Sequence, residues 1–277
     1  MQNNKTPNNM NEVKHNMGRT YYTNGASPTN LGGYVSKSIL WDCFKANSPH
    51  KWIKSGAKKV TPAMTFGQLV HTLTLEPETF NEDFALSEFD SFRSKAAQEW
   101  RDAQEAEGKI VVTMDQYELA RDMQGEIALV MEEIMPLGFA SEVAVYNHSL
   151  RVKGLIDAVP RNGGFLFDLK TTSEIPEDEN AMARFILGRG YHWQAAMYLD
   201  LWNAATGEDR SGFTFLLAET NPACETAVIN LSEKMIDTGR MEYHHALMMW
   251  QQCLKENKWN KRYNSPITLE LPTWYQA

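Results

Sequence analysis

The fold is decided by residues 150–198, and the first part of this stretch reads LRVKGLIDAV (150–159) and then FLFDLKTT (165–172). Both segments are rich in Val, Leu, Ile and Phe, and the sequence Asn162-Gly163-Gly164 between them is typical of a tight turn. We therefore expect a β-hairpin. Two strands joined in this way lie side by side, which can bring Asp157 and Asp168 together.

Two carboxylates that lie close together repel each other unless a cation sits between them. Hard oxygen ligands at strand ends suit Mg²⁺ or Mn²⁺ better than zinc. Lys170 follows Asp168 by two residues, so both side chains share one face of the strand. An ammonium group beside a metal and a phosphate can position water and stabilise negative charge in the transition state. These roles together are those of phosphodiester hydrolysis.

An isolated Asp-x-Lys on a strand is usually only a solvent-exposed edge. Here Phe165, Phe167 and Leu169 alternate with the polar residues, which indicates that one face of the strand is buried. A second element, YHWQAAMY (191–198), has helical character, and Gln194 and Tyr198 are four residues apart and therefore lie on one face.

Asp157, Asp168-Leu169-Lys170 and the Gln194-x-x-x-Tyr198 spacing resemble the PD-(D/E)XK nuclease superfamily, in its RecB-like branch. Within that branch the chain is similar to the RecE-like phage and prophage exonucleases of the exonuclease VIII type. The segments GQLVHTLTLEP (67–77) and GKIVVT (108–113) also fit this family. The resemblance covers residues 34–275.

The resemblance implies an α/β fold with a restriction-endonuclease-like core, in which a mixed central sheet is flanked by helices. It also implies a Mg²⁺ site, with Mn²⁺ as an alternative, formed by His71, Asp157, Asp168 and the backbone carbonyl of Leu169. Taken alone, His71 among aliphatic residues is more often a core histidine than a ligand. Lys170 would orient or activate water, and Gln194 and Tyr198 would support the core or the DNA strand.

The activity that the resemblance implies is 5′-to-3′ exonuclease digestion of linear double-stranded DNA. The 3′ single-stranded tails would serve a single-strand annealing partner in phage-type homologous recombination, and the enzyme would form a ring-shaped homo-oligomer. Two alternatives stay open, which are a structure-specific DNA endonuclease on the same core and a non-catalytic DNA-end-binding protein.

Candidate substrate contacts come from three segments. Arg93 and Lys95 are basic residues near aromatic ones, although a charged helix such as 92–107 is usually only solvated. By resemblance, the segment with Arg189, Tyr191 and His192 lies over the active site and could contact phosphate. The first predicted helix flanks the DNA channel in the family, and its Ser36, Lys37 and Ser38 are chemically able to contact phosphate.

Glu142 could be a further acid near the metal, but its position at the start of a strand favours a structural role. The remaining pattern predicts helices over 36–46, 64–75, 92–107, 113–135, 191–205 and 233–256, and strands over 141–148, 212–218 and 226–231. Residues 177–188 are predicted to form a helix or an ordered loop.

Composition limits the remaining choices. The formal net charge of −8 argues against a generic nucleic-acid coat protein but not against a nuclease with a local basic channel. The three cysteines form no CxxC pair, which indicates a reducing compartment and excludes a four-cysteine iron–sulfur cluster. The sequence has no signal peptide or membrane-spanning run, so we expect a cytoplasmic protein of a bacterial host, encoded by a phage or prophage.

The domain prediction divides the chain in two. Residues 1–30 are rich in Asn, Thr and Gly with few large aliphatic residues, which predicts a flexible polar arm. Residues 31–277 are predicted to form one nuclease domain, because nothing in the sequence forces a split.

Overall fold

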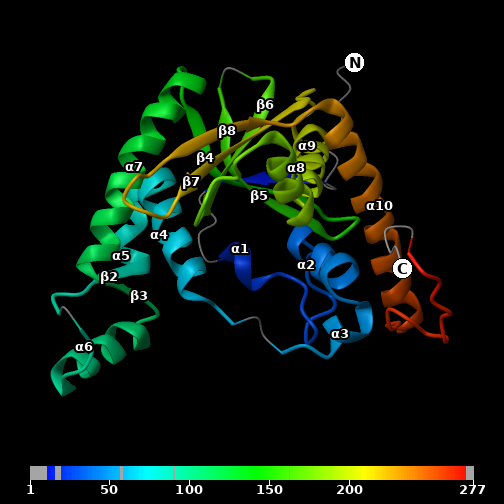
Figure 1. Ribbon diagram of the computed structural model, residues 1–277, viewed down its shortest axis with the longest axis horizontal. Coiled ribbons are helices and arrows are strands. Elements are labelled where there is room, and N and C mark those ends of the chain that lie inside the picture. Colours follow the sequence, from blue (N-terminus) through cyan, green and yellow to red (C-terminus); the bar gives the residue numbers. More distant parts are fainter. Residues whose placement is uncertain (1–10, 16–19, 57–58, 90, 162, 273–277) are drawn as a thin grey trace, which may run out of the picture.

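The computed structural model describes residues 11–15, 20–56, 59–89, 91–161 and 163–272. Its centre is a six-stranded sheet in the order β1-β4-β5-β6-β7-β8 (Figure 1). The strands are β1 (Asn11–Lys14), β4 (Phe139–Asn147), β5 (Val152–Pro160), β6 (Phe165–Thr172), β7 (Gly212–Glu219) and β8 (Thr226–Asn230). The β6–β7 pair is parallel and the other neighbours are antiparallel. The predicted mixed sheet is therefore confirmed.

Helices cover both faces of this sheet (Figure 1). One face packs against α4 (Pro62–Leu75) and α7 (Met114–Ile134), whose apolar residues form a core with Phe167 and Leu169 of β6. The other face carries α2 (Lys37–Trp41), its π-helical continuation η1 (Asp42–Ala46), α3 (Pro49–Ile53), α8 (Glu179–Gly188), α9 (Tyr191–Thr206) and α10 (Glu233–Glu256). The molecule thus has three layers, as the superfamily resemblance implies.

Side-chain caps explain where the predicted helices begin. Thr113 and Gln116 form a capping box at the start of α7, in which each side chain accepts from the backbone N–H of the other residue. The side chains of Thr61, Asp178 and Ser232 accept from backbone N–H groups at the starts of α4, α8 and α10. Gly207 ends α9 in the left-handed region with a φ of 77°.

Two glycines permit close approaches that position the later site. A Cβ on Gly67 of α4 would lie 2.9 Å from Oγ1 of Thr171, so the helix packs directly on β6. A Cβ on Gly154 of β5 would lie 2.8 Å from the ring of Tyr198 on α9. Both elements that flank the hairpin can approach it only because these positions lack a side chain.

The predicted hairpin is β5 and β6, which are antiparallel. Gly163 and Gly164 of the turn have φ values of 72° and 83°, which glycine adopts without strain. Asn162 of the predicted turn lies outside the described residues.

The N-terminal segment differs from the predicted flexible arm. Residues 11–14 form β1 and extend the sheet by pairing with β4, and Thr20–Thr23 form the short helix α1. Val35 then bridges to Val152 of β5. An edge strand needs to bury only one of its two faces, so a segment with few aliphatic residues can still form a strand here. The division of the chain into domains stays a prediction.

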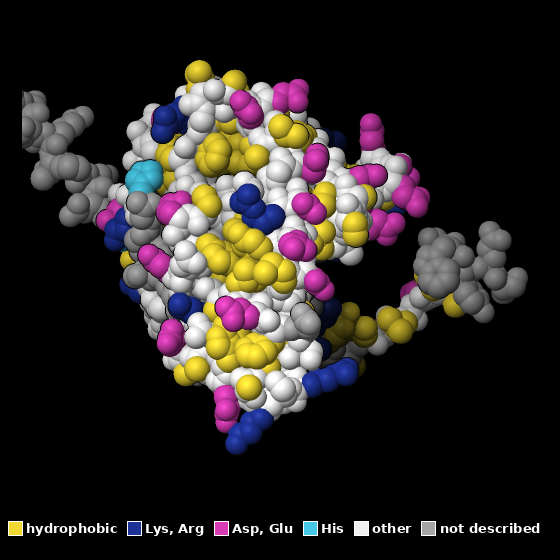
Figure 2. All heavy atoms as spheres, turned by 90° about the vertical axis from the view of Figure 1, so that its left-hand side faces the viewer, with side chains coloured by type: hydrophobic (Ala, Val, Ile, Leu, Met, Phe, Trp, Pro, Cys, Tyr) yellow, Lys and Arg dark blue, Asp and Glu magenta, His cyan; other side chains and the backbone are white. Residues whose placement is uncertain are grey.

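The connection between α4 and α7 forms a small subregion at one end of the molecule (Figure 1). It contains η2 (Pro77–Thr79), α5 (Phe80–Asp83), β2 (Phe84–Leu86), α6 (Lys95–Ala106) and β3 (Ile110–Val112), and β2 and β3 pair in parallel. Figure 2 shows the side of the molecule on which α7 lies, where acidic and apolar side chains are scattered with a few basic ones between them. This face therefore carries part of the net negative charge. Within the described residues no helix is long and apolar enough to cross a membrane.

Candidate active site

The hairpin places the two predicted aspartates next to each other. Ala158 of β5 pairs with Phe167 of β6, so the next residues on each strand are Asp157 and Asp168. The strand ladder does not continue between them. Instead, Oδ2 of Asp157 accepts a hydrogen bond of 2.8 Å from the backbone N–H of Leu169. Both side chains are buried, at 7% and 0% exposure.

Asp168 is held by two side chains. The amide of Gln194 on α9 donates to its Oδ2, and Nζ of Lys170 forms an ion pair with its Oδ1. Gln194 is itself buried, and Tyr198, one turn further along α9, packs against Gly154. The structure thus brings together five of the predicted catalytic residues, although their chemical roles stay predictions.

His71 reaches the same point from α4. Its Nδ1 lies 3.6 Å from Oδ2 of Asp157. Burial, followed by the positive charge of Lys170, lowers the pKa of His71 to about 4. The imidazole is therefore neutral at pH 7, which is the form that binds metal ions.

Glu142 also lies in this cluster. Ser141 pairs with Ala158 and Val143 with Ile156, so Glu142 falls opposite Asp157 in the β4–β5 register, but the two residues do not pair. Like charges placed opposite each other destabilise a sheet. Glu142 also has a φ of 47°, an unfavourable value for a residue other than glycine. The backbone is thus distorted where two acids meet.

Ionisation of all three acids of the cluster, Glu142, Asp157 and Asp168, is unfavourable. Burial raises the pKa of Asp168 to about 6, and the charge of Asp157 adds to this effect. Burial also raises the pKa of Asp157 to about 6, against the lowering effect of Lys170. For Glu142, burial and then the charge of Asp157 raise the pKa to about 9. The single positive charge of Lys170 does not balance the negative charge of three ionised acids.

These donors fit a divalent cation. One ligand atom each from His71, Glu142 and Asp157 lies within 4.8 Å of the other two. Carboxylate oxygens and a neutral imidazole, with acids whose pKa values are raised chiefly by burial, are a donor set for Mg²⁺ or Mn²⁺. Asp168 and the Leu169 backbone adjoin the same cluster.

The surroundings of Lys170 favour its protonated, positively charged form. Burial opposes its charge, but the carboxylates of Asp168 and Asp157 outweigh this effect and raise the pKa of Lys170 above its ordinary value. Its Nζ also lies 5.4 Å from the centre of the Tyr191 ring. Lys170 is therefore protonated at pH 7, and it can stabilise negative charge rather than act as a base.

The structure does not bring every predicted substrate-binding residue to this pocket. His192 is 2% exposed and pairs with Glu242 of α10 at 3.2 Å, so it is not available to substrate in this conformation. Arg189 is exposed, and its guanidinium lies over the ring of Phe185. A histidine that starts an apolar helix is more readily used in helix packing than in a cleft, which explains this difference.

Arg93 and Lys95 lie in the connection between α4 and α7, away from the acids. Both are exposed, and Lys95 is 3.6 Å from Glu99, one turn further along α6. Neither lines the pocket that contains Asp157 and Asp168. Contact with DNA by these two residues stays a prediction that the geometry of the pocket does not support.

The sequence favours a structural role for Glu142 over a place near the metal, and it does not single out Lys153. Both residues line the pocket in the structure. The spacing of Lys153 and Asp157, four apart on one strand and hence on one face, is a signal that could have identified the lysine.

Residues 42–265 match the family described as a PDDEXK-like domain of unknown function (DUF3799). This chain belongs to that family, and the recognition of the PD-(D/E)XK superfamily is confirmed. No curated protein matches the sequence.

A solved structure shows the same fold. A "Putative exonuclease" from Eubacterium rectale superposes with a TM-score of 0.55 at 15% identity, covering 91% of this chain and 95% of its own. A "phage related exonuclease" from Haemophilus somnus 129PT covers 83% of this chain and 100% of its own at 13% identity. The TM-score of this pair is 0.35. The family match over residues 42–265 and the first of these structures together give the chain the PD-(D/E)XK nuclease fold.

Proposed function

We propose that this chain is a divalent-metal-dependent 5′-to-3′ exonuclease that acts on the ends of linear double-stranded DNA. The observation that carries the proposal is the cluster of His71, Glu142 and Asp157 within 4.8 Å, beside the Asp168–Lys170 pair. An acidic cluster with one adjoining ammonium group is suited to bind a cation and a phosphodiester together.

Each residue has a role in this proposal. His71, Glu142, Asp157, Asp168 and the Leu169 carbonyl would hold Mg²⁺, and a bound divalent cation supplies a Lewis acid for the scissile phosphate. The Lys170 ammonium stabilises negative charge on the phosphate oxygens and orients the water. Gln194 fixes the carboxylate of Asp168 by its hydrogen bond, and Tyr198 holds α9 against β5.

The resemblance to RecE-like enzymes supports the finer parts of the proposal. These are 3′ single-stranded tails as the product, a single-strand annealing protein as the partner, a ring-shaped homo-oligomer and a place in phage-type recombination. A cytoplasmic location agrees with three cysteines that are all free. Sedimentation of the purified chain tests the ring, and a single species at the mass of one chain would contradict it.

Digestion of linear duplex DNA with a label on one 5′ end tests the activity, with and without Mg²⁺. We expect release of labelled 5′ mononucleotides only with Mg²⁺, no cutting of closed circular DNA, and loss of activity in Lys170→Ala. Lys255→Ala, at an exposed position near the end of α10, is the matched control. Cutting of the circle would establish an endonuclease instead, and DNA binding without cleavage would establish an end-binding protein.

A further inference from the structure

The last described part of the chain is an exposed segment in which apolar and polar side chains alternate. Residues 266–272 read PITLELP and run without helix, turn or bend. Ile267, Leu269 and Leu271 are 56%, 83% and 76% exposed, and the residues between them are polar. In an extended chain this alternation places the three aliphatic side chains on one face. We call residues 266–272 the C-terminal arm.

The aliphatic face of this arm is open to a partner. Within the described residues, 263–272 form no hydrogen bond, ion pair or ring contact. Aliphatic side chains that are exposed together mark an interaction site, whereas single exposed ones are common on any surface. The arm therefore has the composition of a strand that binds elsewhere.

The strand β8 offers an edge for such a segment. It lies at one end of the sheet, and within the described residues no strand pairs with its outer side. Edge strands usually carry charges or proline, which prevent pairing with another chain. The opposite edge, β1, follows this rule with Glu12 and Lys14, whereas residues 226–232 contain neither a charged residue nor proline. The edge of β8 therefore lacks the features that would block a further strand.

An apolar groove adjoins this edge. It has a volume of about 400 Å³, and Ile134, Phe165 and Leu231 are among the residues that line it. Val228, at the centre of β8, is 43% exposed, and Asn230 two residues later lines the same groove. A strand added beside β8 would place every second side chain on the face of the sheet that carries this groove.

The arm is fastened in a different layer of the molecule from this groove. Arg262 donates to the carbonyl of Asn47 beside η1, in the layer that also contains α10, whereas the groove adjoins Ile134 of α7 on the other face. The five residues from Arg262 to Ile267 span at most about 18 Å. The helix α10, which joins β8 to the arm, is about 36 Å long. Figure 1 shows the arm beside the lower half of α10, while β8 meets the upper end of that helix. The arm of one copy is thus placed to reach a second copy.

We propose that residues 267–271 of one copy add as a strand to the free edge of β8 in a second copy, with the aliphatic face of the arm against Val228 and the groove. Main-chain hydrogen bonds along the edge give such a contact its affinity, and the groove selects the side chains. Each copy offers one arm and one β8 edge on different surfaces, so the contact is head-to-tail and forms a closed ring or an open filament. The proposal rests on the homo-oligomer of the proposed function and names the surface that joins its subunits.

Sedimentation of the full chain at a series of concentrations tests this contact with two variants. Leu269→Asp places a charge on the aliphatic face of the arm, and Val228→Lys places one on the edge of β8. We expect wild type to assemble beyond a single chain and each variant to raise the Kd for self-association at least about 10-fold, because an edge charge opposes strand pairing. Leu129→Asp and Val60→Lys, at exposed positions elsewhere, are the matched controls and should assemble as wild type does.

A mixture of the two variants tests whether the two surfaces are partners. The Val228→Lys chain keeps its arm and the Leu269→Asp chain keeps its β8 edge, so we expect the two to pair one to one and to grow no further. Variants that assemble as wild type does, or monomeric variants that do not pair in the mixture, would overturn the proposal. A wild type that sediments as one chain at every concentration would also overturn it, and the arm would then bind its own copy or another protein.

Folding and activity are followed separately. The arm is exposed along its length, so Leu269→Asp tests the proposal even where Val228→Lys does not fold. Assembly of Leu269→Asp with the wild-type Kd would then be sufficient to reject the contact. Cleavage of linear DNA is measured on the same samples. A wild type that assembles through the arm but does not cleave would refute only the nuclease function.

Discussion

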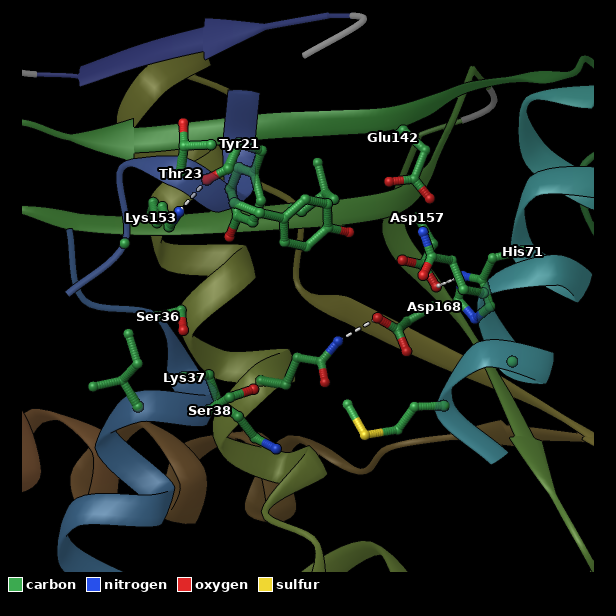
Figure 3. A pocket seen from close by; sticks show the side chains of 18 of the residues that line it. Tyr21, Thr23, Ser36, Lys37, Ser38, His71, Glu142, Lys153, Asp157 and Asp168 are labelled. Carbon is green, nitrogen blue, oxygen red and sulfur yellow. Dashed lines mark hydrogen bonds and ion pairs between the residues drawn. The ribbon is translucent and has the colours of Figure 1, made fainter. Parts of the chain in front are cut away.

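The pocket has two ends that differ in how their charge is balanced (Figure 3). The acid end carries Glu142, Asp157 and Asp168, and the lysine end carries Lys153. At the acid end Lys170 is the near cation for Glu142, Asp157 and Asp168, and burial raises the pKa of all three acids. At the lysine end one buried ammonium group has only neutral acceptors. The acid end therefore lacks the positive charge that a divalent cation would bring, whereas the ammonium group at the lysine end is held by neutral oxygens of the N-terminal segment.

The largest effect is expected from a change that weakens the acid end alone. Asp157→Asn removes a carboxylate between His71 and the Leu169 N–H, and we expect Mg²⁺-dependent cleavage to fall by at least about 10³-fold. DNA binding in EDTA should be equal or tighter, because a negative charge has left the pocket. Asp122→Asn on the exposed side of α7 is the control, measured by the same digestion and binding assays.

If Asp157→Asn kept its cleavage rate, the acid end would not be the catalytic centre. If it lost both cleavage and binding while folded, the acids would be needed to bind DNA as well as to cleave it.

A smaller effect is expected when the hydrogen bond from Gln194 to Asp168 is removed. Gln194→Leu keeps the size of the side chain but removes the donor to Oδ2 of Asp168. Groups that orient a metal ligand typically contribute 10- to 100-fold to activity, and we expect a loss of that size in kcat with little change in Kd for DNA. Single-turnover digestion measures it, with the exposed Gln252→Leu on α10 as the control. An unchanged kcat would show that this hydrogen bond does not position Asp168.

The smallest effect concerns stability against pH without metal. Glu142 has a pKa of about 9 in the folded protein and 4.5 ordinarily, so folding takes up a proton between these values. The stabilisation that this proton gives is complete below the ordinary pKa and is lost as pH rises to about 9. We expect the free energy of unfolding in EDTA to fall by about 1 kcal/mol per pH unit between pH 7 and 8. Above pH 8 the fall should lessen, because burial lowers the pKa of Lys153 to about 8 and the loss of its proton in the folded protein acts in the opposite direction.

Urea denaturation at a series of pH values measures this slope. His71, with a pKa of about 4, and Asp157 and Asp168, with pKa values of about 6, titrate mainly below the chosen window. Glu142→Gln should therefore have a flatter slope than wild type, and saturating Mg²⁺ should remove the fall because it binds the deprotonated acids. Equal slopes for wild type and Glu142→Gln would show that Glu142 is not protonated in the folded state.

Local patterns predicted the acid end, whereas the lysine end depends on contacts that the sequence does not reveal. The alternation of Phe165, Phe167 and Leu169 identified β6, and the hairpin turn implied that Asp157 and Asp168 would meet. His71 needed the resemblance, because its own surroundings are apolar. Glu142 was undervalued because its nearness to Asp157 arises from the register of β4 on β5, which no local pattern fixes.

Lys153 shows most clearly which contacts could not be predicted from the sequence. Its strand was predicted, but the acceptors that hold it come from Tyr21 and Asn24, in a segment predicted to be a flexible arm. The composition of residues 11–30 is poor in aliphatic residues, and only the free edge of β4 gives β1 a place to pair. Such pairing is decided by the whole sheet rather than by the segment itself.

The parallel pairing of β6 with β7 has a consequence for synthesis of the chain. Asp168 and Lys170 lie on β6, but the neighbouring strand β7 and the helix α9 that carries Gln194 follow later in the sequence. At ribosomal rates, the residues between the end of β6 at Thr172 and the end of β7 at Glu219 take roughly 2–10 s to make. During that interval the nascent chain holds its acids without the layer that positions them, so a growing polypeptide lacks the arrangement that the proposed cleavage requires.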